Sequence, residues 1–196
     1  MNIRCLVQTL FLGVVIILLS SGIAHAEYDF PKDPELERAI ADTFGDFDPD
    51  TETANDCRIA LPNFKKAISR GIFDRSKDYL SRAYVHQGML LMCIVSKDPT
   101  LPDAEVQEIW DSMLSSFTRA QQLVPHADAP YFVLGMSYVI IGGAKKSVED
   151  YQTAENYLIK ALQISPSNDL YQSALDEVRQ LIPGKRTPGF KPIPFE

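Results

Sequence analysis

Cysteine and histidine are the residues of this chain whose spacing could support site chemistry. Cys57 and Cys93 are too far apart for a Cys-x-x-Cys redox motif or a zinc knuckle. Neither His86 nor His126 has metal-ligand spacing. The third cysteine, Cys5, lies in an amino-terminal stretch that we expect to be removed on export, so Cys57 and Cys93 remain. In an oxidising compartment a lone pair of thiols usually forms a disulfide, so we predict a bridge between these two cysteines. Two separate buried thiols are the alternative.

Signatures of catalysis are missing from the sequence. It contains no Gly-x-Ser-x-Gly, no phosphate-binding glycine loop and no catalytic-cysteine motif. The acidic run 46–52 suggests a calcium loop, but Thr51 stands where that loop needs glycine and Cys57 where it needs glutamate. We interpret the run as a helix cap, with Asp50 or Thr51 as the capping residue. We expect no enzyme activity, no metal and no cofactor.

Residues 1–26 have the composition of a signal peptide. A single arginine precedes the apolar run Leu10–Leu19, and Ala24 and Ala26 are the small residues that signal peptidase recognises. A membrane span needs about 20 apolar residues, so this run fits a cleaved leader better than an anchor. We expect export to the periplasm or another extracytoplasmic compartment, with Glu27 as the first mature residue. An uncleaved leader is the alternative, and membrane contact would come only through it.

The charge balance disfavours two classes of partner. The chain has 19 basic and 26 acidic residues, which give a formal net charge of −7. An acidic chain with no dense Lys/Arg face binds nucleic acid and anionic lipid poorly. We therefore expect no nucleic-acid or anionic-lipid partner. A protein partner and an apolar small-molecule ligand are the partners that we retain.

Helical periodicity runs through most of the chain, and no segment alternates long enough to predict a strand. We predict an all-α fold of antiparallel helical hairpins. Pro62 should kink or break the second helix near Leu61, and Gly142-Gly143 should end the fifth. The expected helices cover residues 34–44, 52–70, 75–95, 102–123, 129–141, 147–164 and 168–182.

Four segments follow from these elements. They are a signal peptide at 1–26, an acidic segment with one short helix at 27–49, a helical domain at 50–182 and a tail at 183–196. The tail holds four prolines and three apolar residues, so it is expected to run extended, either free or docked on the body.

A pattern of small, bulky and alanine residues recurs on three of the expected helices. Its members share one helical face, and the small ones let a second helix approach closely. Three copies in one chain indicate stacked helical hairpins. The copies are Ala60, Phe64 and Ala67; Met113, Phe117 and Ala120; and Ala154, Leu158 and Ala161. In the last two copies a proline, Pro125 or Pro166, follows and ends the helix.

The helix pairs resemble tetratricopeptide repeats. In that family the first helix of a pair carries Leu-Gly and then a tyrosine, and the second carries the small–bulky–alanine face. The first-helix matches are Tyr84, Gly88 and Leu91 in one pair, and Leu134, Gly135 and Tyr138 in the next. The spacing between pairs exceeds the family's period of about 34 residues. The resemblance therefore implies an irregular bundle or short solenoid, not a regular superhelix.

The resemblance also implies a binding function, because the first helices of such pairs line a concave face. We expect a non-catalytic scaffold that mediates protein–protein interaction in the cell envelope. The alternative is a carrier that holds an apolar ligand between helices 77–95 and 129–141. Both helices are apolar almost all round, which fits either a closed core or an apolar cavity. The candidate binding residues are Val85, Met89, Met92, Phe132, Met136, Val139 and Ile140.

Overall fold

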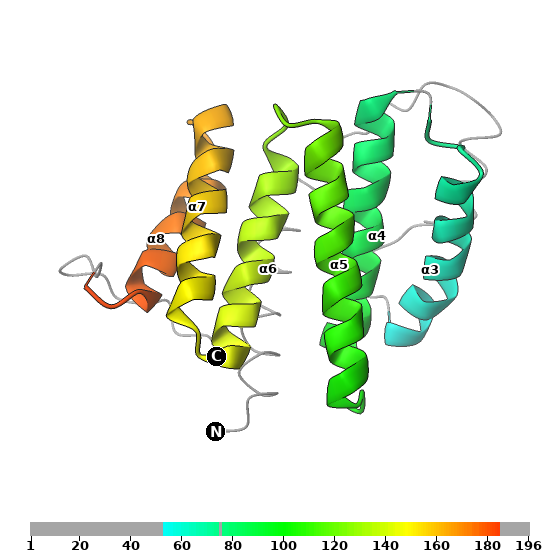
Figure 1. Cartoon of the computed structure of the whole chain (residues 1–196), viewed down its shortest axis with the longest axis horizontal. Coiled ribbons are helices and arrows are strands. Elements are labelled where there is room, and N and C mark those ends of the chain that lie inside the picture. Colours follow the sequence, from blue (N-terminus) through cyan, green and yellow to red (C-terminus); the bar gives the residue numbers. More distant parts are fainter. Residues whose placement is uncertain (1–52, 75, 185–196) are drawn as a thin grey trace. The chain divides into compact units, whose positions relative to one another are not determined.

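The computed structural model describes residues 53–74 and 76–184, and all regular structure in these ranges is helical. The all-α prediction is confirmed, and within 53–124 and within 125–184 consecutive helices pack as hairpins (Figure 1). The predicted signal peptide, the acidic segment with its short helix, and all but the first two residues of the tail lie outside the described residues. The helices are α3 (Ala54–Ser69), α4 (Lys77–Lys97), α5 (Asp103–Leu123), α6 (Ala129–Lys145), α7 (Val148–Ile164) and α8 (Asp169–Leu181).

The described helices belong to two compact units, one with α3, α4 and α5 and the other with α6, α7 and α8. The prediction of one domain over 50–182 stays a prediction. None of these helices is both long enough and apolar enough to cross a bilayer.

The α3–α5 unit is built around α4, which packs against both α3 and α5. The apolar faces predicted for α3 and α5 form its core. Phe64, Phe117 and Ala120 have no exposed surface, and Met113 and Ala67 are 1% and 5% exposed. Burial of such apolar side chains is the main driving force that joins the three helices.

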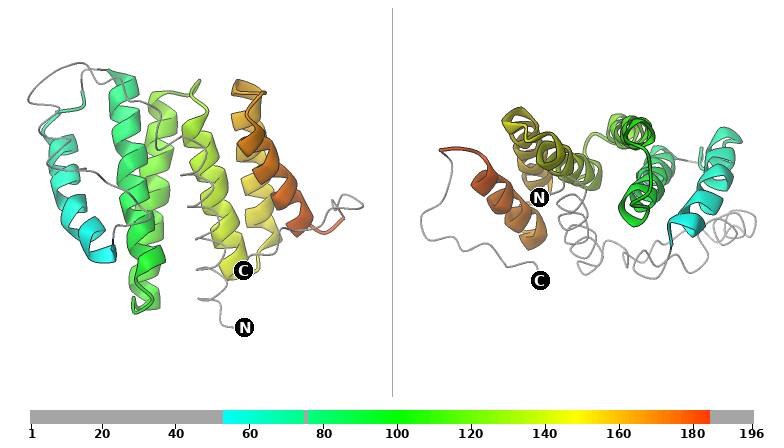
Figure 2. Two further views of the ribbon diagram at one scale, coloured as in Figure 1. Left: turned by 180° about the vertical axis from the view of Figure 1, so that it is seen from behind. Right: turned by 90° about the horizontal axis from the view of Figure 1, so that it is seen from below.

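The α6–α8 unit has the same kind of core. α7 packs against both α6 and α8, and Figure 2 shows α8 lying against α7. Ala154, Leu158 and Ala161 have no exposed surface, as the sequence pattern predicts for the inner face of α7. The buried Glu155 accepts a hydrogen bond from Arg179 Nε at 3.0 Å, which satisfies the one carboxylate that α7 buries in this unit.

The start of α3 differs from the prediction. Thr53, not Asp50 or Thr51, is the N-cap, because Thr53 and Asp56 form a reciprocal capping box. The predicted break near Leu61 is wrong, since α3 continues without interruption from Ala54 to Ser69. Pro62 lies on the exposed face, where water can hydrate the carbonyl group that loses its N–H partner.

The end of α6 also differs from the prediction. The helix continues through Gly142 and Gly143 and ends at Lys145, with Lys146 in the left-handed conformation as its C-cap. Gly142 has a packing role instead. A Cβ atom there would lie 2.9 Å from Cδ1 of Tyr151, so the glycine allows α7 to approach. Glycine does end α3, where Gly71 has φ of +70°.

Candidate functional site

The predicted disulfide is present. Cys57 of α3 and Cys93 of α4 are bonded, with α-carbons 6.4 Å apart. Such a bridge is compatible with an extracytoplasmic location. It joins the first helix of the α3–α5 unit covalently to the central one.

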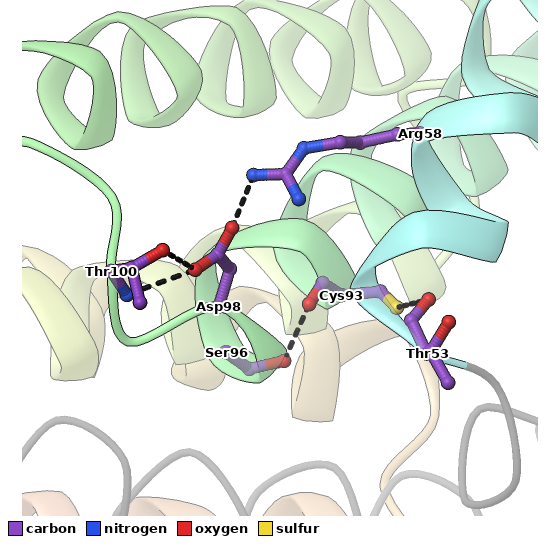
Figure 3. A network of polar contacts seen from close by, with 6 residues as sticks. All are labelled: Thr53, Arg58, Cys93, Ser96, Asp98 and Thr100. Atoms are coloured by element: carbon purple, nitrogen blue, oxygen red, sulfur yellow. Dashed lines mark hydrogen bonds and ion pairs between the residues drawn. The ribbon is translucent and has the colours of Figure 1, made fainter.

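Polar contacts beside the disulfide hold the same two helices together (Figure 3). Arg58 of α3 donates a hydrogen bond from Nη2 to Oδ2 of Asp98, at 2.5 Å. The backbone N–H and the hydroxyl of Thr100 donate to the other oxygen of that carboxylate, at 2.9 and 2.6 Å. The Thr100 hydroxyl and then the Arg58 guanidinium lower the pKa of Asp98 to about 2. Asp98 is therefore ionised at all physiological pH values.

A polar groove of about 600 Å³ opens on the surface of the α3–α5 unit. Its volume is within the range of ligand sites in proteins, and three helices contribute side chains to it. We call it the α3–α5 groove. It is lined by Lys65 of α3, by Tyr84 and Gln87 of α4, and by Asp111, Ser112, Ser115, Ser116 and Arg119 of α5.

Hydrogen bonds fix the inner part of this groove. Gln87 donates from Nε2 to the hydroxyl of Ser116 at 3.0 Å, and that hydroxyl donates to the backbone carbonyl of Ser112 at 2.8 Å. Ser116 is only 3% exposed. The bond from α4 to α5 therefore orders the polar surface at the junction of the two helices.

The outer part of the groove carries mainly hydrogen-bond donors that have no partner among the described residues. Among the described residues, the side chains of Lys65, Tyr84, Ser115 and Arg119 form no hydrogen bond or ion pair with one another or with any other side chain. Asp111 is the single acidic residue of the lining and accepts a hydrogen bond from the neighbouring Gln107 at 2.9 Å. The groove thus combines two cations and one anion in a chain that is acidic as a whole.

The binding residues predicted from the sequence lie elsewhere. Val85 and Met89 of α4 are half-buried, and Met92 of the same helix is 5% exposed. Four predicted residues are on α6 and belong to the other unit; their exposed fractions are 6% or less. They are Phe132, Met136, Val139 and Ile140. None of the seven lines the α3–α5 groove.

The groove was not predicted from the sequence, because the binding face was expected on the first helices of the pairs only. Five of the eight lining residues are on α5, a second helix, and Lys65 is on another. Asp111, Ser112, Ser115, Ser116 and Arg119 recur at helical spacing, which is the one signal that the sequence contains. That pattern also describes any hydrated helix face.

Outside the groove, the histidine His86 and possible clusters of metal ligands are the remaining features with potential site chemistry. Burial and then the charge of Arg82 lower the pKa of His86 to about 4, so its imidazole is neutral at pH 7. Within 53–74 and 76–184, no group of three or more His, Cys, Asp or Glu residues could hold a metal ion.

No protein-family model matches the chain, and comparison with curated proteins finds no significant relative. The resemblance to tetratricopeptide repeats therefore rests on the residues quoted for it and stays a prediction.

Proposed function

We propose that this chain is a non-catalytic, exported binding protein that mediates protein–protein interaction in the cell envelope. Its tetratricopeptide-like helical hairpins serve as the scaffold, and the α3–α5 groove is the surface that receives the partner. The observation that carries this proposal is an open groove in which four donor side chains, those of Lys65, Tyr84, Ser115 and Arg119, have no partners among the described residues. Polar groups left exposed in a concave surface are available to recognise a second molecule.

The location supports the same proposal. The leader-like composition of 1–26 and the disulfide between Cys57 and Cys93 both fit a protein that matures in the periplasm. The bridge also suits a binding scaffold, because it limits the movement of α3 and thus of the groove wall that carries Lys65.

The apolar carrier is the second prediction, and it has less support. Five of its seven wall residues are 6% exposed or less, which fits a role in the cores of their own units. The residues that line the α3–α5 groove, by contrast, each carry a polar or charged group. A protein surface is a better match for that lining than an apolar ligand.

The test is to fill the groove without touching the core. Ser115 is exposed and lines the groove, so Ser115→Trp should obstruct it. Gln122→Trp adds the same ring to an exposed position of α5 outside the groove and is the matched control. Each tagged protein is purified from envelope extracts after reversible crosslinking, and retained proteins are identified by mass spectrometry.

We expect a specific protein to be retained by the wild type and by Gln122→Trp, and to be lost from Ser115→Trp at unchanged melting temperature. Equal retention by all three proteins would contradict the groove as the docking surface. An apolar small molecule that co-purifies without any protein would instead support the carrier.

A further inference from the structure

We propose that the α3–α5 groove recognises an acidic segment of the partner, with Lys65 of α3 and Arg119 of α5 binding its carboxylates. This inference rests on the proposed function, and it adds the chemistry of the segment that the groove takes. Six of the eight lining residues are on the second helices α3 and α5 and two are on the first helix α4, whereas the binding face predicted from the sequence lies on first helices alone.

The groove offers more hydrogen-bond donors than groups that only accept hydrogen bonds. Lys65 offers three N–H groups, Arg119 offers five, and the hydroxyls of Tyr84 and Ser115 add two more donors. None of these side chains has a partner among the described residues. Asp111 is the only lining side chain that is solely an acceptor. A ligand that satisfies this surface must therefore be rich in acceptors.

The charge of the groove also favours an acidic ligand. The two cations of the groove come from different helices, α3 and α5, whereas the chain carries a net charge of −7. A local positive surface on an acidic protein attracts an anionic group and disfavours a basic one. The guanidinium of Arg119 can bind a carboxylate through two parallel hydrogen bonds, and Lys65 supplies a second point charge from α3.

Asp111 explains why a peptide suits the groove better than a small anion. Its carboxylate is one turn from Ser115 and two turns from Arg119 on α5, so it would repel a compact anion that filled the groove. An extended peptide presents backbone N–H groups as well as carboxylates. Asp111 can then accept a hydrogen bond from a backbone N–H of the peptide, while Lys65 and Arg119 bind its acidic side chains.

The experiment measures the affinity of the purified protein for a fluorescent hexaglutamate peptide, with hexalysine and hexaserine as comparison probes. We expect binding of hexaglutamate alone, with Lys65→Gln and Arg119→Gln each weakening it by about 3- to 10-fold. Lys66→Gln and Arg70→Gln remove the same charges from exposed positions outside the groove and should leave the affinity unchanged.

Four results would overturn the proposal. Equal weakening by all four variants would indicate general charge attraction. Preferential binding of hexalysine would show that the groove selects basic peptides. Preferential binding of hexaserine would show that the groove does not select by charge. Displacement of the peptide by inorganic phosphate at concentrations where acetate has no effect would assign the groove to free phosphate.

The inference and the proposed function can fail separately. Loss of the partner in Ser115→Trp, together with unchanged retention in Lys65→Gln and Arg119→Gln, would contradict only the acidic segment. Retention of the partner in Ser115→Trp, together with specific hexaglutamate binding, would contradict only the proposed docking surface.

Discussion

Gly88 of α4 lies directly against the ring of Phe117 on α5: a Cβ atom at Gly88 would be 2.2 Å from Cε1 of that ring. The other unit repeats this relationship. A Cβ atom at Gly135 of α6 would be 2.9 Å from Cγ of Leu158 on α7. In both hairpins the glycine of the first helix thus makes room for the bulky residue of the second helix, so the two backbones pack closely.

The substitution Gly88→Ala should therefore destabilise the α3–α5 unit. Alanine raises helix propensity by up to about 1 kcal/mol, but its methyl group must displace a fully buried ring. Overpacking of this kind costs about 1–3 kcal/mol, and the steric term should prevail because a contact of 2.2 Å cannot be accommodated without movement. Urea unfolding measures the change in the free energy of unfolding.

A double variant provides the control. Gly88→Ala combined with Phe117→Leu should be less destabilised than the sum of the two single changes, because leucine lacks Cε1 and Cζ, the two atoms nearest to the added methyl group. Additive losses, or a Gly88→Ala protein as stable as the wild type, would mean that the two residues do not share a tight contact.

The disulfide should contribute substantially to stability. Cys57 and Cys93 are 36 positions apart, and closing a loop of that length stabilises a chain by about 3–4 kcal/mol in the chain-entropy model. The double variant Cys57→Ala/Cys93→Ala should lose about this amount in chemical denaturation. Addition of a reductant should lower the stability of the wild type and leave the variant unchanged.

Two observations would argue against that contribution. One is equal stability of the wild type with and without reductant. The other is recovery of two free thiols when the denatured protein is alkylated without prior reduction.

His86 should make the protein sensitive to acid. Burial and the charge of Arg82 lower its pKa from 6.5 to about 4, so the folded state favours the neutral imidazole. The unfolded chain takes up a proton near pH 6.5, earlier than the folded chain. The contribution of His86 to stability is therefore fully present above pH 6.5 and decreases as the pH falls towards 4, by at most about 3 kcal/mol.

The measurement is the free energy of unfolding at several pH values between 7 and 4. His86→Gln should remove part of the decrease in this interval. Parallel curves for the wild type and His86→Gln would show that another group causes the acid sensitivity.

Helical periodicity and local stop signals were sufficient to predict the fold class and most helix ends. Pro102 precedes α5 as predicted, and Gly71 ends α3 in the left-handed conformation. The disulfide was also predictable, since a hairpin stack brings the second helix of one pair against the first helix of the next. These features depend on chemistry within one or two neighbouring elements.

Features that depend on a distant side chain could not be predicted in this way. Gly142 does not end α6, because its role is set by Tyr151 on the next helix. Ser115 and Arg119 of α5 belong to a groove because side chains of α3 and α4 line it together with them. In the sequence alone, these residues are indistinguishable from the hydrated face of an amphipathic helix.

Photo-crosslinking in living cells from position 112 tests directly whether the α3–α5 groove docks a protein. Ser112 is exposed and lines the α3–α5 groove, so a photoreactive amino acid at this position should crosslink to the docked partner. The same amino acid at Gln122, on the same helix but outside the groove, is the control. We expect one protein of the envelope to crosslink from position 112, not from position 122, and to disappear when Ser115→Trp is added. No crosslinked protein from position 112, or the same products from both positions, would contradict the central claim that this groove docks a protein partner.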